Sequence, residues 1–214
     1  MYKFPKDLYV DVRIEETFET RISFKKRDLQ EQKVRINKGA FVRIFDGNRW
    51  YYSSLTDIDG VQEAIDTLAQ MAAPNPKIME HPVVKAFEVN QDTVLQYENN
   101  SVADIPVEKK QALLEGYLDL VKYPEIVHHT SYYVDRKTKK SIYSSKGTAV
   151  IFDTQTCGIR LNLELVYKEN KDTGVASKAA VYFDELKGLE DYFKEEIEKS
   201  VTFVREAKPV EPGI

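Results

Sequence analysis

The chain has 214 residues, of which 31 are basic and 35 are acidic, so its formal net charge is −4. Its composition of 42% hydrophobic and 31% charged residues, with only 9 Gly and 8 Pro, is that of a globular protein and excludes disordered and collagen-like classes. The acidic balance argues against a general polyanion binder, because nucleic-acid-binding domains usually carry a basic excess.

The scarcity of cysteine and the lack of long apolar runs define the expected compartment. Cys157 is the single cysteine and cannot form an internal disulfide. No apolar run reaches the roughly 18 to 20 residues that a membrane-spanning helix needs. Residues 1–10 lack the apolar core and cleavage pattern of a secretory signal. These features predict a cytoplasmic, reduced protein with no membrane partner.

The first 55 residues alternate apolar and polar side chains in short runs. A period of two is typical of half-buried strands with one wet face, as in an antiparallel sheet. Candidate turns separate the runs at residues 26–28, 37–39 and 46–48, the last being an Asp-Gly-Asn hairpin signal. Trp50 begins a further predicted strand.

Helical spacing replaces the strand pattern after residue 56. Thr56 or Asp57 is the candidate N-cap, and Pro74 and Pro76 end the helix. The apolar face of this predicted helix consists of Val61, Ala64, Ile65, Leu68 and Met71. The first unit, residues 1–72, is therefore predicted to be a β-meander closed by one amphipathic helix.

A connector is predicted over residues 73–106, which hold four of the eight prolines. Little regular structure is expected there apart from one short strand near residues 93–97. Asp104 and Pro106 then suit the cap and first position of a second helix over residues 107–122.

The strand pattern returns in the second half of the chain, and a third helix follows it. The predicted strands are 125–134, 139–144, 147–153, 158–168 and 174–183, with breaks at 135–138, 146–147, 153–156 and 170–174. The third helix has one apolar face, formed by Leu189, Phe193, Ile197, Val201 and Val204. Pro209 and Pro212 prevent its continuation.

Two segments of the first half resemble segments of the second. Residues 38–46 are similar to 146–153, and residues 57–61 are similar to 184–189. We therefore predict an α+β fold made of two related units, each an antiparallel β-meander closed by an amphipathic helix, with a helix and a Pro-rich connector between them. The predicted parts are residues 1–72, the connector 73–106, the second unit 107–208 and a junction over 209–214.

The histidines and the cysteine offer little material for a metal or thiol site. His81 lies beside Pro82, and the adjacent His128 and His129 point to opposite faces of a predicted strand. None of them has metal-ligand spacing. Cys157 has no base partner near it in the sequence, so we interpret it as structural. No catalytic or metal-binding residue is predicted in this chain, and the substrate-binding residues are unknown.

Other motifs also point away from a recognisable active site. Glycines are scattered singly, so neither a phosphate-binding loop nor a dinucleotide fingerprint is present. Basic clusters at residues 25–27 and 136–140 lie in predicted hairpin turns and are interpreted as solvated loop tips. Sheet edges could pair with an extended peptide, which the composition permits but does not require.

Residues 10–17, 21–25 and 39–50 resemble the amino-terminal domain of the TldD/PmbA family. The helix, connector, second strand unit and the run 209–213 follow in the order expected of that family. These proteins are named for a proposed modulation of DNA gyrase and are understood as metal-dependent peptidases. The family's carboxy-terminal domain carries a His-Glu-x-x-x-His helix and a ligand cysteine, and Cys157 does not match that cysteine.

The resemblance implies a non-catalytic amino-terminal region of a peptidase that acts on extended or unfolded peptides. Such a region would help to enclose the substrate chamber and to assemble a homodimer, or a heterodimer with a family paralogue. Zinc is expected in the missing carboxy-terminal domain and no cofactor in this chain, which is expected to be inactive alone. The alternatives are a stand-alone peptide- or protein-binding module and a gyrase-associated factor. Direct nucleic-acid binding is not expected.

Overall fold

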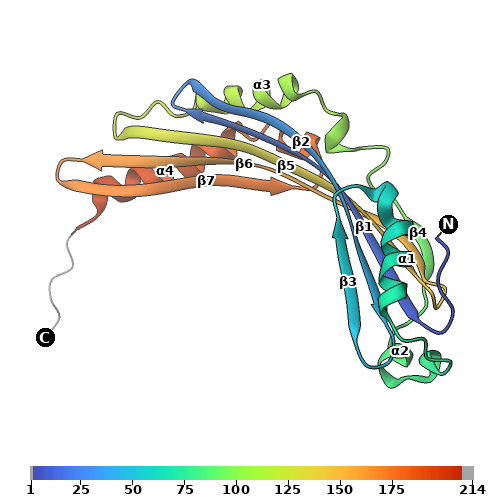
Figure 1. The fold of residues 1–214 in the computed structure, drawn as a ribbon. Helices are drawn as coiled ribbons and strands as arrows, with labels where there is room; N and C mark the ends of the chain where they lie inside the picture. The colour runs from blue at the N-terminus through green and yellow to red at the C-terminus, as the bar shows by residue number, and fades with distance from the viewer. Residues whose placement is uncertain (1, 209–214) are drawn as a thin grey trace, which may run out of the picture. The chain divides into compact units, whose positions relative to one another are not determined.

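The computed structural model describes residues 2–208 of the chain as an α+β protein (Figure 1). Its strands are β1 (Tyr9–Lys25), β2 (Asp28–Phe45), β3 (Trp50–Leu55), β4 (Gln91–Val94), β5 (Ile126–Ser144), β6 (Ala149–Tyr167) and β7 (Asn170–Ala180). Its α-helices are α1 (Val61–Met71), α2 (Pro82–Lys85), α3 (Val107–Leu118) and α4 (Glu190–Glu206). Short 3-10 turns, η1 (Ile58–Gly60), η2 (Ile78–Glu80), η3 (Val102–Asp104) and η4 (Phe183–Leu186), complete the described elements.

The described residues form two compact units that interleave along the sequence. Unit 1 contains residues 2–18, 36–99 and 137–154, whereas unit 2 contains 19–35, 100–136 and 155–208. The hydrogen-bonded strand order is β3-β2-β1-β5-β6-β4, and β7 pairs with β6. β2–β3 and β6–β7 are antiparallel pairs, while β4 lies parallel to β6. Strands β1, β2, β5 and β6 therefore each contribute residues to both units.

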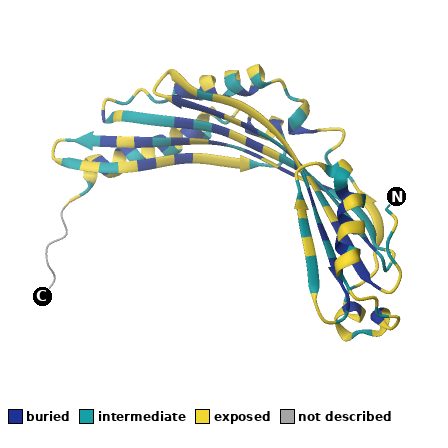
Figure 2. Cartoon of the chain, in the orientation of Figure 1, coloured by how far each residue is buried: buried dark blue, intermediate teal, exposed yellow. Residues whose placement is uncertain are grey.

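Unit 1 buries the apolar stripe of α1 against one face of its strands. The helix contributes Val61, Ala64, Ile65 and Leu68, and the strands contribute Val10, Val12, Ala40, Val42 and Ile44. In Figure 2 the buried positions form a stripe along α1, as the 3.6-residue period requires. Asp57 caps η1 by accepting a hydrogen bond from the Asp59 N–H, so the expected N-cap leads into the helix through a 3-10 turn.

The β2–β3 hairpin of unit 1 is organised by a buried aspartate. Gly47 has a φ of 102°, as the Asp-Gly-Asn signal predicts. The Asp46 carboxylate accepts hydrogen bonds from the N–H groups of Asn48 and Arg49 at 2.8 Å and of Ala73 at 3.4 Å. Burial alone would raise the pKa of Asp46, but these hydrogen bonds and one from the Tyr51 hydroxyl outweigh it and lower the pKa below its ordinary value.

Unit 2 has its own core, which lies between its strands and the helices α3 and α4. The predicted face of the third helix is buried through Phe193, Ile197, Val201 and Val204. Gly174 lies within β7, where a Cβ atom would come within 2.5 Å of the Ser200 Oγ of α4. A glycine at this position therefore lets the helix approach the strand closely.

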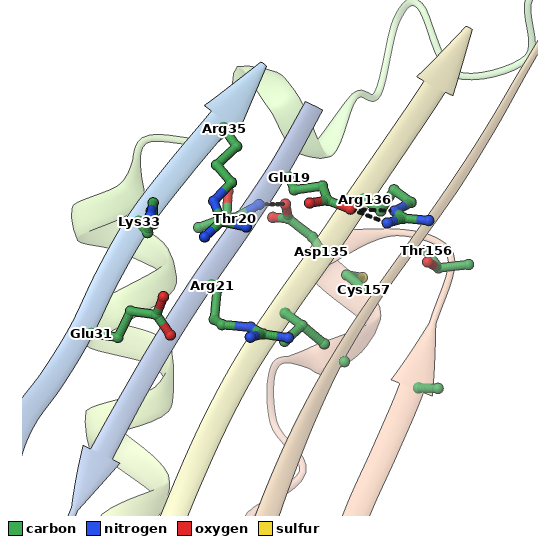
Figure 3. A pocket seen from close by; sticks show the side chains of 13 residues that line it. Glu19, Thr20, Arg21, Glu31, Lys33, Arg35, Asp135, Arg136, Thr156 and Cys157 are labelled. Carbon is green, nitrogen blue, oxygen red and sulfur yellow. Dashed lines mark hydrogen bonds and ion pairs between the residues drawn. The ribbon is translucent and has the colours of Figure 1, made fainter. Parts of the chain in front are cut away.

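The opposite face of the unit 2 strands carries charged side chains rather than helices. Arg21 on β1, Lys33 on β2 and Arg136 on β5 project there, as the close-up in Figure 3 shows. The same strands thus have one face packed under α3 and α4 and one face bearing charges, which explains their alternating burial.

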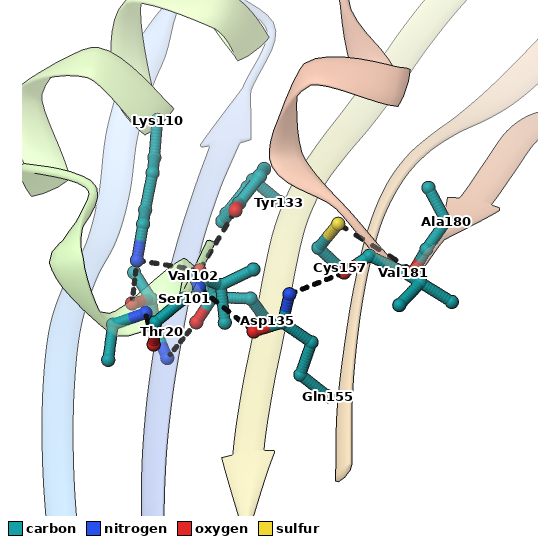
Figure 4. Close-up of polar contacts among 11 residues, drawn as sticks. Thr20, Ser101, Val102, Lys110, Tyr133, Asp135, Gln155, Cys157, Ala180 and Val181 are labelled. Atoms are coloured by element: carbon teal, nitrogen blue, oxygen red, sulfur yellow. Dashed lines mark hydrogen bonds and ion pairs between the residues drawn. The ribbon is translucent and has the colours of Figure 1, made fainter. Parts of the chain in front are cut away.

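A buried polar network fixes α3 on the covered face of these strands (Figure 4). The Lys110 ammonium of α3 lies 2.6 Å from a carboxylate oxygen of Asp135 and donates to the Thr20 Oγ1 at 2.9 Å. Asp135 also accepts from the Thr20 N–H at 3.0 Å and from the Tyr133 hydroxyl at 2.8 Å. Burial lowers the pKa of Lys110 although Asp135 opposes that shift, so the ion pair must offset a real desolvation cost.

The α+β class is confirmed, but the expected pair of separate meanders is not. Several predicted breaks lie inside continuous strands: residues 37–39 are within β2, residues 135–138 within β5 and residues 153–156 within β6. The basic cluster 136–140 therefore belongs to a strand rather than to a turn. Three of its four charges are paired there, Arg136 with Glu19, Lys137 with Asp153 and Lys140 with Glu15.

The structure also differs from the prediction in the positions of two glycines, one strand break and the end of one helix. Gly39 lies within β2 whereas Gly147 occupies the β5–β6 turn, so the two similar segments are not equivalent in structure. The break expected at residues 170–174 is instead a turn before Asn170, and α3 ends at Leu118 rather than near residue 122. The predicted junction over residues 209–214 lies outside the described residues.

We expect Asp46→Ala to lower the free energy of unfolding of unit 1 by about 1–2 kcal/mol at pH 7, because three backbone N–H groups lose their acceptor. The depressed pKa stabilises the fold fully above the unfolded value of about 3.9, and this stabilisation is lost as the pH falls through the folded pKa. The difference in the free energy of unfolding between wild type and variant should therefore become smaller in acid. Urea unfolding followed by the fluorescence of Trp50, the single tryptophan, measures it. Asp66→Ala, at an exposed site on α1, is the matched control, and equal losses in both variants would contradict the prediction.

We expect Lys110→Met to destabilise unit 2 by about 3–5 kcal/mol, because it leaves the buried Asp135 carboxylate without its counter-charge. Urea unfolding followed by circular dichroism measures the loss. Lys109→Met, at the exposed neighbouring position, should change the free energy of unfolding by less than about 0.5 kcal/mol. Adding Asp135→Asn to Lys110→Met should recover part of the loss. Equal effects of the two lysine variants would show that the buried pair is not required.

Candidate functional site

The strongest candidate site of the chain is the uncovered face of the unit 2 strands. We call this surface the open face and define it by the residues that line two adjoining hollows. The first hollow, of about 540 Å³, is lined chiefly by β1, β2 and β5, including Arg21, Lys33, Arg35 and Arg136. The second, of about 470 Å³, continues across β5, β6 and β7 and includes Tyr132 and Arg160. Arg21, Val134, Gly158 and Ala179 line both, so the hollows form one continuous surface.

The positions of the cations follow directly from strand geometry. Lys33 and Arg35 are two residues apart on β2, so they share one face of the strand. Arg21 lies on the neighbouring strand β1 and projects to the same side, as Figure 3 shows. All three side chains are exposed, and none of them makes a hydrogen bond or an ion pair with another described residue. The open face thus presents three unmatched positive charges.

Other charged groups on the open face are only partly matched. The Arg136 guanidinium donates to the Glu19 carboxylate, and the Arg160 Nε donates to Asn162 at 2.7 Å. Glu31 lies on β2 two residues before Lys33 and lines the first hollow. The arrangement is therefore a cationic surface interrupted by carboxylates, suited to binding an anionic group but lacking a nucleophile with a base beside it.

The single cysteine lines the first hollow without being reactive. Cys157 is buried, and its Sγ lies 3.7 Å from the carbonyl oxygen of Ala180. Burial, with the nearby negative charge of Asp135, raises the pKa of this thiol to about 12. A thiol that stays protonated at neutral pH is a poor nucleophile, which favours the structural interpretation of Cys157.

The three histidines are dispersed over both units. His81 caps α2 by accepting from the Val83 N–H at 3.2 Å, and its ring packs edge-on against Phe45. His128 and His129 lie on β5 in unit 2. Burial, with the neighbouring charges of His128 and Lys26, lowers the pKa of His129, and its Nδ1 is buried without a partner.

No metal-binding constellation exists within residues 2–208: no three His, Cys, Asp or Glu side chains there are placed to hold an ion. The family resemblance places zinc in the carboxy-terminal domain, so we derive no metal chemistry from these residues. The described helices include none that is long and apolar enough to span a bilayer.

Sequence reasoning named no site residue and missed the open face. A signal was nevertheless present, since Glu31, Lys33 and Arg35 alternate with Gln32 and Val34. That alternation places these three charged residues on one side of a strand. The sequence alone did not show that this charged side of β2 is the uncovered one, because that depends on where α3 packs.

The comparison with protein families matches residues 10–72 to the model described as PmbA/TldA metallopeptidase domain 1. No curated protein sequence matches the chain.

Three solved structures share the fold at low sequence identity. One from Thermotoga maritima and one from Bacteroides thetaiotaomicron are described as candidate modulators of DNA gyrase. They are 14% and 13% identical to this chain, with TM-scores of 0.76 and 0.66 over 96% and 95% of it. The third is TldE from Thermococcus kodakarensis, 14% identical with a TM-score of 0.62 over 96% of this chain.

The chain spans about half the length of these proteins, covering 46%, 47% and 46% of them respectively. The family match and the shared fold agree with the motifs at residues 10–17, 21–25 and 39–50. The resemblance expected from the sequence is therefore confirmed, with residues 10–72 matching the model of PmbA/TldA metallopeptidase domain 1.

Proposed function

We propose that this chain is the amino-terminal, non-catalytic region of a TldD/PmbA-type metal-dependent peptidase that acts on extended or unfolded peptides. The observation that carries the proposal is the match of residues 10–72 to the first domain of a metallopeptidase family. The fold shared with TldE over 96% of the chain supports it.

In this proposal the chain has a structural role and supplies no catalytic group. Its sheet helps to enclose the substrate chamber, and its surfaces help to assemble a homodimer or a heterodimer with a family paralogue. Zinc belongs to the carboxy-terminal domain. The protein acts in the cytoplasm and has no membrane partner, in keeping with a single unpaired cysteine.

One alternative is a stand-alone peptide- or protein-binding module without peptidase activity. The part of β2 that precedes Ala40 favours it, because this part has no β3 partner and an unpaired strand edge can add a further extended chain through backbone hydrogen bonds. A gyrase-associated regulatory factor is a second alternative, supported by the naming of two structures with this fold.

We expect the purified chain of residues 1–214 to cleave no unfolded protein and to retain no stoichiometric zinc, because its described residues offer no ligand set. Fluorescently labelled, denatured casein is a suitable substrate, and elemental analysis measures the metal. A bacterial metallopeptidase of known activity serves as the positive control. Cleavage by the chain that a chelator abolishes would overturn the assignment of a non-catalytic role.

The proposal also makes a prediction about the protein in its source cell. Antibodies raised against residues 1–214 should detect a polypeptide about twice as long, since the chain covers 46–47% of the matching structures. Mass spectrometry of that polypeptide should find a His-Glu-x-x-x-His segment. Detection of a stable product no longer than this chain would instead favour the stand-alone module.

A further inference from the structure

We propose that the open face of unit 2 binds acidic polypeptide segments in an extended conformation. Arg21, Lys33 and Arg35 would contact the carboxylates of the bound segment. This proposal goes beyond the proposed function and does not rest on it, because it concerns a surface of this chain and requires no catalytic domain.

The first argument is unmatched charge. Several exposed or half-exposed arginines elsewhere in the chain are paired, as Arg27 is with Asp119 and Arg205 with Glu125. Arg21, Lys33 and Arg35 lie on two neighbouring strands and have no acidic partner among the described residues. Like charges held on adjacent strands repel one another, and a bound anion relieves that repulsion.

The second argument is spacing. Lys33 and Arg35 project from one face of β2 at positions separated by about 6.8 Å along the strand. Every second side chain of an extended peptide has the same separation, because the peptide adopts the same backbone geometry. A peptide with acidic residues at alternate positions therefore matches both cations at once when it lies along β2.

The third argument is the shape of the surface. Beyond the cations, the two hollows are lined by the small residues Gly158 and Ala179 and by the exposed apolar side chain of Val134. Five strands cross this part of the sheet, which at strand spacing gives a surface roughly 19 Å wide. A surface of that width leaves room beside β2 for the side chains of a peptide that lies along the strand, so it suits a segment rather than a single small anion.

The character of the surface favours a polypeptide over nucleic acid. Glu19 and Glu31 interrupt the cations and would oppose a continuous row of phosphates. Sheets that bind single-stranded nucleic acid present several aromatic rings for base stacking. Tyr132 is the one aromatic side chain among the described residues that line the two hollows.

The test measures binding of a fluorescein-labelled peptide of alternating Glu and Ser residues to the full 214-residue chain by fluorescence anisotropy. We expect Lys33→Glu/Arg35→Glu to weaken binding roughly tenfold at low ionic strength, because two exposed ion pairs become repulsive contacts. Raising the ionic strength should weaken wild-type binding, because exposed charges are screened by salt. A peptide of alternating Gln and Ser should not bind.

The matched control is Lys109→Glu/Lys122→Glu, which makes the same change in net charge at exposed positions of unit 2. Lys109 lies on α3, which covers the other face of the strands. The control should bind the acidic peptide within about twofold of wild type. Circular dichroism and thermal unfolding verify that both variants are folded. Should the reversal variant misfold, Lys33→Gln/Arg35→Gln replaces it, with a smaller loss expected in the same direction.

Three outcomes would overturn the proposal. The first is no binding of the acidic peptide by the wild-type chain at low ionic strength. The second is an equal loss in the reversal variant and its control, which would assign the effect to net charge rather than to the open face. The third is tighter binding of single-stranded oligothymidine of the same charge, which would identify the surface as a nucleic-acid site.

Discussion

Four strands of 17 to 19 residues impose the main constraint on this chain, because each must serve two cores. A strand alternates its faces with a strict period of two, so one register error anywhere would expose the apolar residues of both units. Buried polar anchors oppose such slippage within each unit. In unit 1 the Asp46 carboxylate holds the β2–β3 hairpin, and in unit 2 the Lys110–Asp135 pair ties α3 to β5. These contacts have discrete geometry, whereas apolar contacts tolerate sliding.

The sequence predicted the helices better than the ends of the strands, for a physical reason. The faces of α1 and α4 consist of apolar residues at helical spacing. Their burial is confirmed except at Met71, which is exposed, and at Leu189, which precedes α4 and is half-buried. Strand breaks were inferred from charged and glycine-containing clusters that normally mark turns. In β5 the cluster 136–140 is instead partly neutralised by acidic residues of β1, through the pairs Arg136–Glu19 and Lys140–Glu15. Pairing between residues more than a hundred positions apart leaves no local signal.

The candidate site also depends on contacts between residues that are distant in the sequence. Alternation along β2 places Lys33 and Arg35 on one side, which the sequence shows plainly. Which side remains uncovered depends on where α3 packs, and that depends on Lys110, a residue that looks like any surface lysine of a helix. Its burial becomes intelligible only when Asp135 and Thr20 are brought beneath it. The open face is therefore a consequence of the buried pair on the opposite side of the same strands.

The net charge of the whole chain does not predict the charge of one surface, because it sums residues on all faces while a ligand contacts only one of them. The helix α4 alone carries six acidic and three basic residues and packs on the covered side of unit 2. The open face carries unmatched cations although the whole chain has a net charge of −4. With a screening length of about 8 Å at physiological ionic strength, a ligand on one face responds mainly to the charges within reach. The exclusion of polyanion binding drawn from overall composition therefore applies to the chain as a whole and does not extend to the strand face that bears Arg21, Lys33 and Arg35.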